Sequence, residues 1–345
     1  MPEARVIPMP GVGDEPPRSR RAGSRVPAKA TEPAVPTVPP TPTPTLPPTR
    51  TLPPLPADSG EAAPGGAGWE ERVAQGLAFL RRRLTGDFEV DEFGYDEDFT
   101  DQVYLPALRP LYKSWFRIET FGMHNIPDSG GALVVANHSG TVPMDGLMTS
   151  LAVHDDHPAH RRLRLLGADL VFKLPLVGSV ARKTGNTLAC NADAERLLHS
   201  GELVGVYPEG FKGVGKPFAD RYKLQRFGRG GFVSAAIRTG VPIIPCSIVG
   251  AEEIYPMIGN LKSLARILGI PYLPITPTFP LLGPLGLIPL PSKWLIEFGE
   301  PIPTAHLGTS AAEDPMLVFN LTDQVRETIQ QSLYSLLMQR GSVFS

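Results

Sequence analysis

The stretch from Val134 to Asp145, VVANHSGTVPMD, places an imidazole and a carboxylate close together after an apolar run. Six residues separate His138 from Asp145. A histidine held by a carboxylate is a general base matched to neutral pH, because the carboxylate fixes the tautomer and stabilises the imidazolium that forms. The chain has no G-x-S-x-G sequence that would supply a serine nucleophile. The pair would therefore activate a hydroxyl of the substrate, although a lone histidine after a strand is more often a capping or packing residue.

A second block, VYPEGFKGVGKPF at Val206–Phe218, places Glu209 in a turn that follows an apolar strand. Gly210 and the two later glycines of this block let backbone amides face an anion. Cationic side chains follow within about 18 residues, opposed only by Asp220: Lys212, Lys216, Arg221, Lys223, Arg226 and Arg229. A local basic patch in a chain of net charge −2 suits phosphate groups. The plainer alternative is a solvated basic loop.

The elements that must position these residues alternate along the chain. Apolar runs predict strands at 132–137, 162–168, 203–210 (ending in a turn), 241–250 and 294–302. Helical patterns at 142–154, 191–201, 229–240 and 315–339 fall between or after them. This alternation predicts an α/β sheet with helices on both faces. Sites in such sheets form at the carboxyl ends of strands, which is where His138 and Glu209 lie in the sequence.

Composition divides the chain into a tail and a folded part. Residues 1–68 hold 18 of the 39 prolines and almost no aromatic residues. Such a segment cannot bury enough apolar surface to offset its ordering entropy, so we expect it to be disordered. Residues 69–345 are predicted to form a single domain, with amphipathic N-terminal helices at 69–118, an α/β core at 119–305 and a C-terminal helix at 306–345.

Charge and cysteine content exclude several classes of protein. A net charge near zero gives no indication of nucleic acid binding. The two cysteines, Cys190 and Cys246, have no metal-binding spacing, which favours a reducing compartment without a disulfide framework or a metal site. The N-terminus also lacks the apolar core of a secretory signal. We therefore expect a cytoplasmic protein without a metal or other cofactor.

The segment 267–292 is the most apolar part of the chain, with no charged residue in 26 and with seven prolines. Proline at that density removes backbone donors and breaks helices, so the segment does not read as a membrane-spanning helix. One interpretation is an apolar surface that rests in a membrane interface or lines an acyl channel. The other is a buried strand and loop interrupted by prolines.

Three blocks in this order resemble the glycerophospholipid and lysophospholipid acyltransferase superfamily. They are the N-H…D block at 137–145, Pro-Glu-Gly about 70 residues later, and Val-Pro-Ile-Ile-Pro about 30 residues beyond. The chain looks like a divergent bacterial-type member, with the resemblance covering roughly residues 105–305. The resemblance implies a mixed, mostly parallel sheet flanked by helices, preceded by amphipathic helices that touch the membrane. It also implies acyl transfer from acyl-CoA or acyl carrier protein to a hydroxyl of a lysophospholipid, glycerol phosphate or related lipid alcohol.

By the same resemblance, His138 is the catalytic base and Asp145 its orienting partner. Glu209, Gly210 and Lys212 belong to the block that binds the acceptor, and Lys216 lies in the basic stretch that would bind phosphate. We expect backbone amides near the His138 and Gly210 turns to hold the oxyanion. The implied partners are acyl-CoA, a lipid acceptor and the inner face of the cell membrane.

The chain departs from the family pattern in three places. The family spacing is H-x4-D, whereas six residues lie between His138 and Asp145 here, so we expect a longer turn that leads into a helix with Asp145 in its first turn. The usual PEGTRS reads PEGFKG, which replaces an arginine with Lys212. The block that usually ends in a phosphate-binding arginine has none at that place, and Arg182 or Lys183 is the expected substitute. These departures predict a neutral or larger lipid alcohol as acceptor.

Two other functions are compatible with the same residues. A thioester or lipid hydrolase would use the same histidine base on water. A non-catalytic lipid-binding protein would keep the fold and use the Pro-rich tail to recruit partners.

Overall fold

The computed structural model describes residues 5–7, 67–86, 88–139, 142–228, 230–267, 269 and 271–344. The chain forms two compact units, one of Met1–Val12 with Gln75–Ser345 and the other of Gly13–Ala74. The predicted disordered tail at 1–68 lies outside the described residues, apart from 5–7 and 67–68. The larger unit contains the sheet and the candidate site.

A seven-stranded sheet forms the centre of the larger unit, in the order β3-β11-β8-β4-β7-β5-β6. Its strands are β3 (Glu119–Phe121), β4 (Ala132–Ala136), β5 (Leu163–Gly167), β6 (Thr187–Leu188), β7 (Leu203–Val206), β8 (Ile243–Val249) and β11 (Leu295–Phe298). β11 runs antiparallel to β8, and every other neighbouring pair is parallel. The predicted α/β fold with a mixed, mostly parallel sheet is confirmed.

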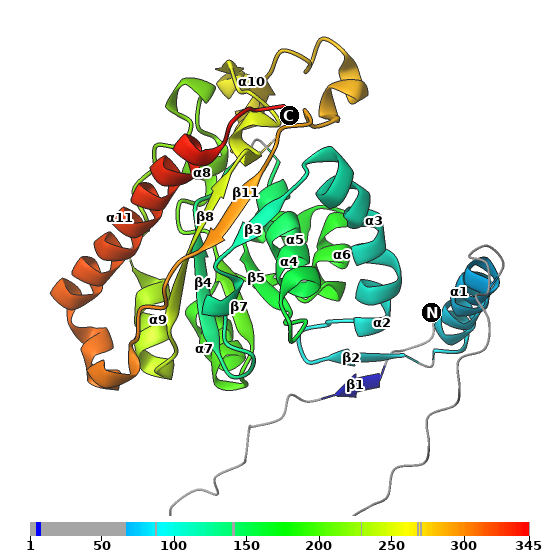
Figure 1. Ribbon diagram of the computed structural model, residues 1–345, viewed down its shortest axis with the longest axis horizontal. Coiled ribbons are helices and arrows are strands. Elements are labelled where there is room, and N and C mark those ends of the chain that lie inside the picture. The colour runs from blue at the N-terminus through cyan, green and yellow to red at the C-terminus, as the bar shows by residue number, and fades with distance from the viewer. Residues whose placement is uncertain are drawn as a thin grey trace, which may run out of the picture. The chain divides into compact units, whose positions relative to one another are not determined.

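Helices precede, connect and follow these strands (Figure 1). They are α1 (Ala67–Thr85), α2 (Glu97–Phe99), α3 (Leu105–Pro110), α4 (Met144–Asp156), α5 (Asp169–Lys173), α6 (Val177–Lys183), α7 (Asn191–His199), α8 (Phe211–Val214), α9 (Gly231–Thr239), α10 (Lys262–Ile267) and α11 (Pro315–Gln339). Two small strand pairs lie outside the main sheet: β1 (Arg5–Ile7) with β2 (Glu89–Asp91), and β9 (Gly259–Asn260) with β10 (Pro274–Ile275). The helix predicted at 315–339 has the bounds of α11, because its apolar period is unbroken.

The second of the expected N-terminal helices is not a regular α-helix. Turns with π-helical hydrogen bonding, at Thr100–Tyr104 and Leu111–Trp115, lie on either side of α3. Pro106 and Pro110 fall in this stretch, and each lacks the N–H that an α-helical turn would use. The interrupted bonding pattern follows from those two missing donors.

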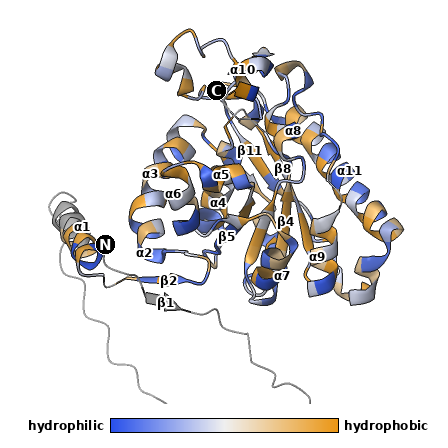
Figure 2. Ribbon diagram, turned by 180° about the vertical axis from the view of Figure 1, so that it is seen from behind, coloured by the Kyte–Doolittle hydropathy of each residue, from blue (hydrophilic) through white to orange (hydrophobic). Residues whose placement is uncertain are grey.

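The hydrophobic core lies on both faces of the sheet. Along β4 the side chains alternate: Val134 and Ala136 join a core cluster with Met148 of α4, and Leu133 and Val135 join a second cluster. The second cluster includes residues from α7, α9 and α11. The central strands are correspondingly hydrophobic in Figure 2. Because both faces of β4 are buried, packing fixes its carboxyl end. The positions of Asn137 and His138, which follow directly, are fixed with it.

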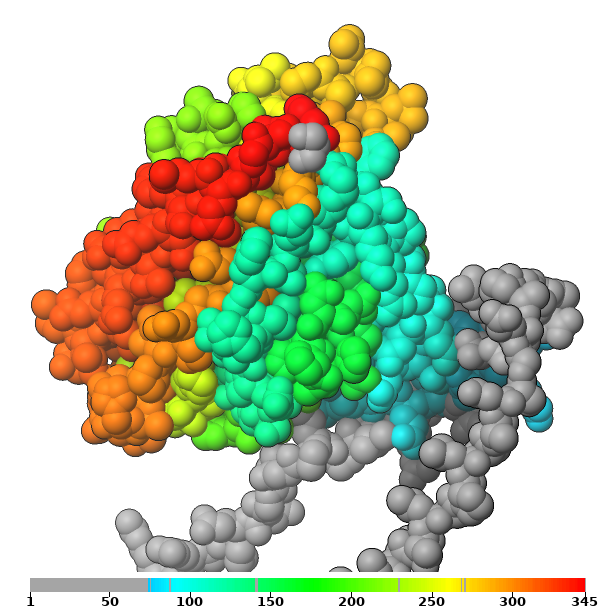
Figure 3. All heavy atoms as spheres, viewed as in Figure 1, coloured from blue at the N-terminus to red at the C-terminus, as the bar shows by residue number. Residues whose placement is uncertain are grey.

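The apolar segment 267–292 lies mostly at the surface and not in the core. Its large apolar side chains include several that are more than half exposed: Ile267, Leu281, Leu282, Leu285, Leu287 and Ile288. It stands out at one end of the molecular surface next to α10 (Figure 3). The segment connects the carboxyl end of β8 to β11, so it lies at the same edge of the sheet as the carboxyl ends of β4 and β7. No helix in the described ranges is long and apolar enough to cross a membrane.

Candidate functional site

The candidate site lies where two neighbouring parallel strands end. β4 and β7 pair in register from Ala132 with Leu203 to Val135 with Val206. His138 stands two residues beyond β4, and Glu209 stands three residues beyond β7. The main-chain N–H of His138 donates a 2.9 Å hydrogen bond to Oε1 of Glu209. The two blocks that the sequence separates by 71 positions are therefore in direct contact.

The structure also brings Asp145 back to His138. Asp145 lies in the first turn of α4, and its Oδ2 is 2.8 Å from Nδ1 of His138. The six intervening residues are therefore compatible with a direct hydrogen bond between the imidazole and the carboxylate, as the longer turn predicts. The carboxylate is fully buried, while the imidazole is 16% exposed. The pair thus faces the surface through the histidine alone.

Several donors fix the Asp145 carboxylate. Besides the imidazole, the N–H of Ser139 donates to Oδ2 at 2.8 Å and the N–H of Gly146 donates to Oδ1 at 2.9 Å, and the Ser139 hydroxyl donates to Oδ2 at the longer distance of 3.5 Å. A carboxylate at Nδ1 places the ring proton there and leaves the lone pair on Nε2. The ring also lies against Tyr207, with centroids 4.7 Å apart. Burial, and then the charge of Asp145, raises the pKa of Tyr207 well above its ordinary value, so this neighbour is a neutral phenol.

Asn137 fixes the strand end that carries the histidine. It is fully buried, and its amide accepts from the N–H of Ile248 at 2.7 Å and donates to the carbonyl of the same residue at 3.0 Å. This side chain therefore takes the place of a backbone partner and extends the pairing of β4 with β8. The sequence identified Asn137 only as a polar residue after a strand. Its pairing with Ile248 could not be predicted, because the two residues lie 111 positions apart.

Glu209 is turned into the protein. Its side chain is fully buried, and the N–H of Gln225 donates to Oε2 at 2.6 Å while the His138 N–H occupies Oε1. Burial raises the pKa of Glu209, and the nearby Lys216 ammonium opposes that effect. The next residue, Gly210, has φ of 54° and ψ of −140°, a conformation open essentially to glycine alone. The Pro-Glu-Gly turn thus directs the carboxylate inward and connects the His138 loop to the basic loop.

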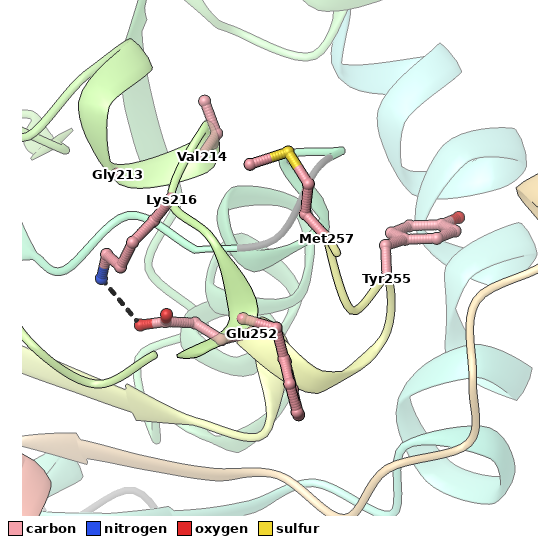
Figure 4. Close-up of a pocket in the computed structure, with 7 residues that line it drawn as sticks. Gly213, Val214, Lys216, Glu252, Tyr255 and Met257 are labelled. Carbon is pink, nitrogen blue, oxygen red and sulfur yellow. Dashed lines mark hydrogen bonds and ion pairs between the residues drawn. The ribbon is translucent and has the colours of Figure 1, made fainter. Parts of the chain in front are cut away.

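Lys216 is also interior, with its side chain 2% exposed. Its Nζ lies 3.1 Å from Oε1 of Glu252 and 3.8 Å from Oε2 of Glu209. Figure 4 shows the ammonium and the Glu252 carboxylate pointing toward each other beside a cavity of about 10 Å³. That volume suits about one water molecule. Sequence reasoning missed Glu252, because nothing in its local pattern distinguishes a buried carboxylate after a strand from an exposed one.

The titration of Glu252 gives a stability prediction. Burial is the largest influence on its carboxyl and raises the pKa from 4.5 to about 7. Between those values the folded protein holds a proton that the unfolded chain has released. The contribution of the raised Glu252 pKa to the free energy of unfolding is therefore fully present below pH 4.5 and is lost as the pH rises through about 7. We expect urea midpoints of the wild type to fall across this range relative to Glu252→Gln, whose side chain does not titrate. Parallel profiles of the two proteins would contradict the assignment.

A glycine of α8 lies directly behind the histidine. A Cβ added at Gly213 would stand 2.7 Å from the carbonyl oxygen of His138 and 2.9 Å from the Cβ atoms of His138 and Glu209. Two of these three atoms belong to the residue proposed as the base, and one is backbone that cannot move alone. The position therefore admits no side chain unless the His138 loop moves.

Gly213→Ala is accordingly expected to displace His138 and to lower any His138-dependent activity by roughly 10- to 100-fold, since misplacing a reacting group by about 1 Å costs that much. Gly228→Ala is the matched control, because its Cβ would meet nothing closer than the Pro208 carbonyl at 3.9 Å. The measurement is kcat for both variants beside the wild type. Equal rates for all three proteins would show that the close approach is unimportant.

The remaining predicted site residues lie at the surface. Lys212 is exposed on α8 next to Phe211, which is 46% exposed. Arg182 is exposed on α6, where its guanidinium lies 5.2 Å from the ring centroid of Phe172. No contact within the described part of the chain joins Arg182 to His138 or Glu209. The same residues contain no cluster of three or more histidine, cysteine, aspartate or glutamate side chains that could hold a metal ion.

The first N–H groups of the His138 turn and of the Gly210 turn already have hydrogen-bond partners within the protein. The N–H of His138 donates to Glu209, that of Ser139 to Asp145, and that of Gly210 to the Tyr207 carbonyl at 3.0 Å. These three groups serve to fix the turns. The expectation that backbone amides near these turns hold an oxyanion stays a prediction for the other N–H groups there.

Comparisons with known proteins point to one family. The family described as Acyltransferase matches residues 117–249. An uncharacterized protein of Mycobacterium tuberculosis is 64% identical over 272 residues, covering 79% of this chain and 76% of that protein. The 1-acyl-sn-glycerol-3-phosphate acyltransferase alpha of Ovis aries is 31% identical over 154 residues, covering 44% of this chain and 51% of the enzyme. The crystal structure of a 1-acyl-sn-glycerophosphate acyltransferase from Thermotoga maritima aligns with a TM-score of 0.44 and 20% identity, covering 77% of this chain and 97% of that one. The matched residues 117–249 contain both His138 and Glu209.

Proposed function

We propose that the chain, as a member of the acyltransferase family, transfers a fatty acyl group from a thioester donor to a lipid hydroxyl. The observation that carries the proposal is the 2.8 Å contact between Nδ1 of His138 and the buried Asp145 carboxylate. It directs the lone pair of Nε2 toward the partly exposed side of the ring, where a hydroxyl can approach. The donor is acyl-CoA or an acyl carrier protein, and the acceptor is a lysophospholipid, glycerol phosphate or related lipid alcohol.

The reaction proceeds by direct transfer. Nε2 of His138 takes the proton of the acceptor hydroxyl as that oxygen attacks the thioester carbonyl carbon. Asp145 stabilises the imidazolium while the new C–O bond forms. The C–S bond then breaks, and the departing thiolate receives the proton from the imidazolium. The protein ends in its starting protonation state, and no covalent intermediate with a side chain is required.

The exposed basic loop supplies the charge for phosphate groups. Lys212 stands on α8, one turn from the Glu209 turn, and other exposed cations follow it: Arg221, Lys223 and Arg226. Guanidinium and ammonium groups of this kind pair with the phosphates of CoA or of an anionic acceptor. Arg182 of α6 is a candidate for the same role, since it is exposed and cationic.

The apolar segment 267–292 and its surroundings form the proposed membrane contact. Exposed leucine and isoleucine side chains gather there, at the sheet edge that carries His138. An enzyme whose substrates are lipids gains access to them by resting such a surface in the bilayer interface. We therefore place the protein at the inner face of the cell membrane, with α1 as a further amphipathic contact.

The membrane contact predicts a loss of vesicle binding in the double variant Leu281→Asp with Leu285→Asp. The two side chains are 83% and 66% exposed. Burying a leucine contributes about 1.5–3 kcal/mol, so we expect binding to phosphatidylglycerol-containing vesicles to fall by roughly 10-fold or more. Met316→Asp is the matched control, because Met316 is 66% exposed but lies at the start of α11. Equal sedimentation of the double variant and the wild type would count against an interface role.

The function itself is tested by supplying radiolabelled acyl-CoA with a panel of acceptors. The panel contains glycerol phosphate, lysophosphatidate, lysophosphatidylcholine, monoacylglycerol and a long-chain alcohol. We expect labelled ester with at least one acceptor and slow acyl release without any. Release of free fatty acid at one rate, whatever acceptor is present, would identify a hydrolase. Binding of the lipids without either reaction would identify a non-catalytic protein.

A further inference from the structure

We propose that Lys216, held between Glu209 and Glu252, is a positioning residue that sets the place of the His138 loop. This inference rests on the proposed function, in which His138 is the base. It differs from the phosphate-binding role that the sequence suggests for Lys216. An ammonium that is 2% exposed and that contacts two carboxylates is not offered to a ligand.

The first step runs from Glu209 to the base. One carboxylate oxygen accepts from the N–H of His138 and the other from the N–H of Gln225. Both bonds require acceptors, and an ionised carboxylate offers acceptors on both oxygens. A protonated Glu209 would carry a hydroxyl on one of these oxygens, which accepts more weakly than an ionised oxygen and adds a donor beside a buried N–H. The place of His138 therefore depends on the charge of Glu209.

The second step runs from Lys216 to Glu209. Burial opposes ionisation of the Glu209 carboxyl, and the Lys216 charge is the largest influence in the opposite direction. The ammonium lies 3.8 Å from the carboxylate oxygen that accepts from Gln225. Lys216 is thus the group that keeps Glu209 ionised in an apolar setting.

The third step concerns Glu252, which holds Lys216 in place. The two side chains form the shorter of the two ion pairs, at 3.1 Å. The groups that act on the Glu252 carboxyl are the ammonium of Lys216, the main-chain N–H of Tyr222 and the more distant charge of Glu209. Met257 and Tyr255 line the same small cavity (Figure 4), and the side chains of Lys216 and Glu252 are both buried. Above about pH 7, where Glu252 is ionised, the Lys216 ammonium has a carboxylate partner on each side and stays fixed.

Lys216→Met is the direct test, because methionine keeps the length of the side chain and removes its charge. We expect kcat to fall by roughly 10- to 100-fold, the size expected when a reacting group is displaced by about 1 Å. The KM values for acyl-CoA and for the acceptor should change by less than about 3-fold. A role in phosphate binding predicts the reverse, a raised KM with an intact kcat, and that result would overturn the proposal.

A second variant tests the charge balance. Lys216→Met leaves two carboxylates without a cation, whereas Lys216→Met combined with Glu252→Gln removes one of them. We expect the double variant to recover part of the folding stability, because only one buried carboxylate then lacks a cation. Its kcat should stay low, because Glu209 still lacks the charge of Lys216. A double variant with the kcat of the wild type would also overturn the proposal. Lys173→Met is the matched control, since Lys173 forms a surface ion pair with Asp169 and is 75% exposed.

A third readout does not depend on catalysis. The ring resonances of His138, identified by their loss in His138→Ala, should move in Lys216→Met and stay moved in the double variant, because both proteins lack the charge that keeps Glu209 ionised. Unchanged resonances would overturn the proposal even in a protein without acyl transfer. Absence of transfer by the wild type refutes the proposed function instead, and the two failures are therefore distinguishable.

Discussion

His138→Ala is expected to lower the rate of acyl transfer by roughly 10²- to 10⁴-fold, the contribution of a general base to catalysis. The imidazole is the only part of this residue that the change removes. The main-chain N–H that donates to Glu209 remains, so the loop keeps its connection to the neighbouring strand end. The measurement is kcat with saturating acyl-CoA and the best acceptor, together with the KM for each. Because the ring takes the proton only as the acceptor attacks, KM should change little.

The control for this variant is His306→Ala. His306 is exposed and lies in a short helical turn at Ala305–Leu307, far along the chain from the site loops. We expect its kcat to match the wild type. A His138→Ala protein that transfers acyl groups at the wild-type rate would refute the assignment of the base, whatever its effect on stability.

The fold was largely predictable because it depends on short-range patterns. The apolar run at 132–137 ends in a polar pair, and the structure ends β4 at Ala136 for the same reason. The period of apolar residues from Pro315 onward identifies α11 over its whole length. In an α/β sheet the order of the strands then decides which loops meet. The meeting of His138 with Glu209 follows from the pairing of β4 with β7, which the sequence indicates only as two strands of one sheet.

The inner layer of the site was not predictable in the same way. Glu252 and Lys216 are a carboxylate and an ammonium among many, and only the burial of both distinguishes them from surface charges. Gly213 is one of three glycines in its loop, and its close approach to His138 depends on two loops from different strands. The apolar segment 267–292 allowed two interpretations, because exposure is a property of the packed chain and not of the segment. Contacts between distant segments set each of these features.

Asp145→Asn is expected to lower kcat by roughly 10²- to 10⁴-fold, as loss of the orienting carboxylate does in a histidine-based site. The wild-type carboxylate accepts from the Nδ1–H of His138, from the N–H groups of Ser139 and Gly146 and, at 3.5 Å, from the Ser139 hydroxyl. An amide has one acceptor oxygen and one donor NH₂. If the oxygen stays with His138 and Ser139, the NH₂ faces the N–H of Gly146, and the reverse orientation sets two donors against the imidazole side. The amide can also turn the imidazole to the other tautomer, which places the proton on Nε2 and removes the base.

The size and shape of the side chain are nearly unchanged in this variant, so a loss of activity reports the charge and the acceptors. The ring resonances of His138 distinguish the two causes, since a switched tautomer changes which ring nitrogen carries the proton. Asp155→Asn is the control, because Asp155 also lies on α4. Its carboxylate pairs at 2.8 Å with Arg109 of α3 and not with the site. We expect that variant to keep its kcat. If Asp145→Asn were as active as Asp155→Asn, the six-residue spacing would have placed the carboxylate beside the base without any role in orienting it.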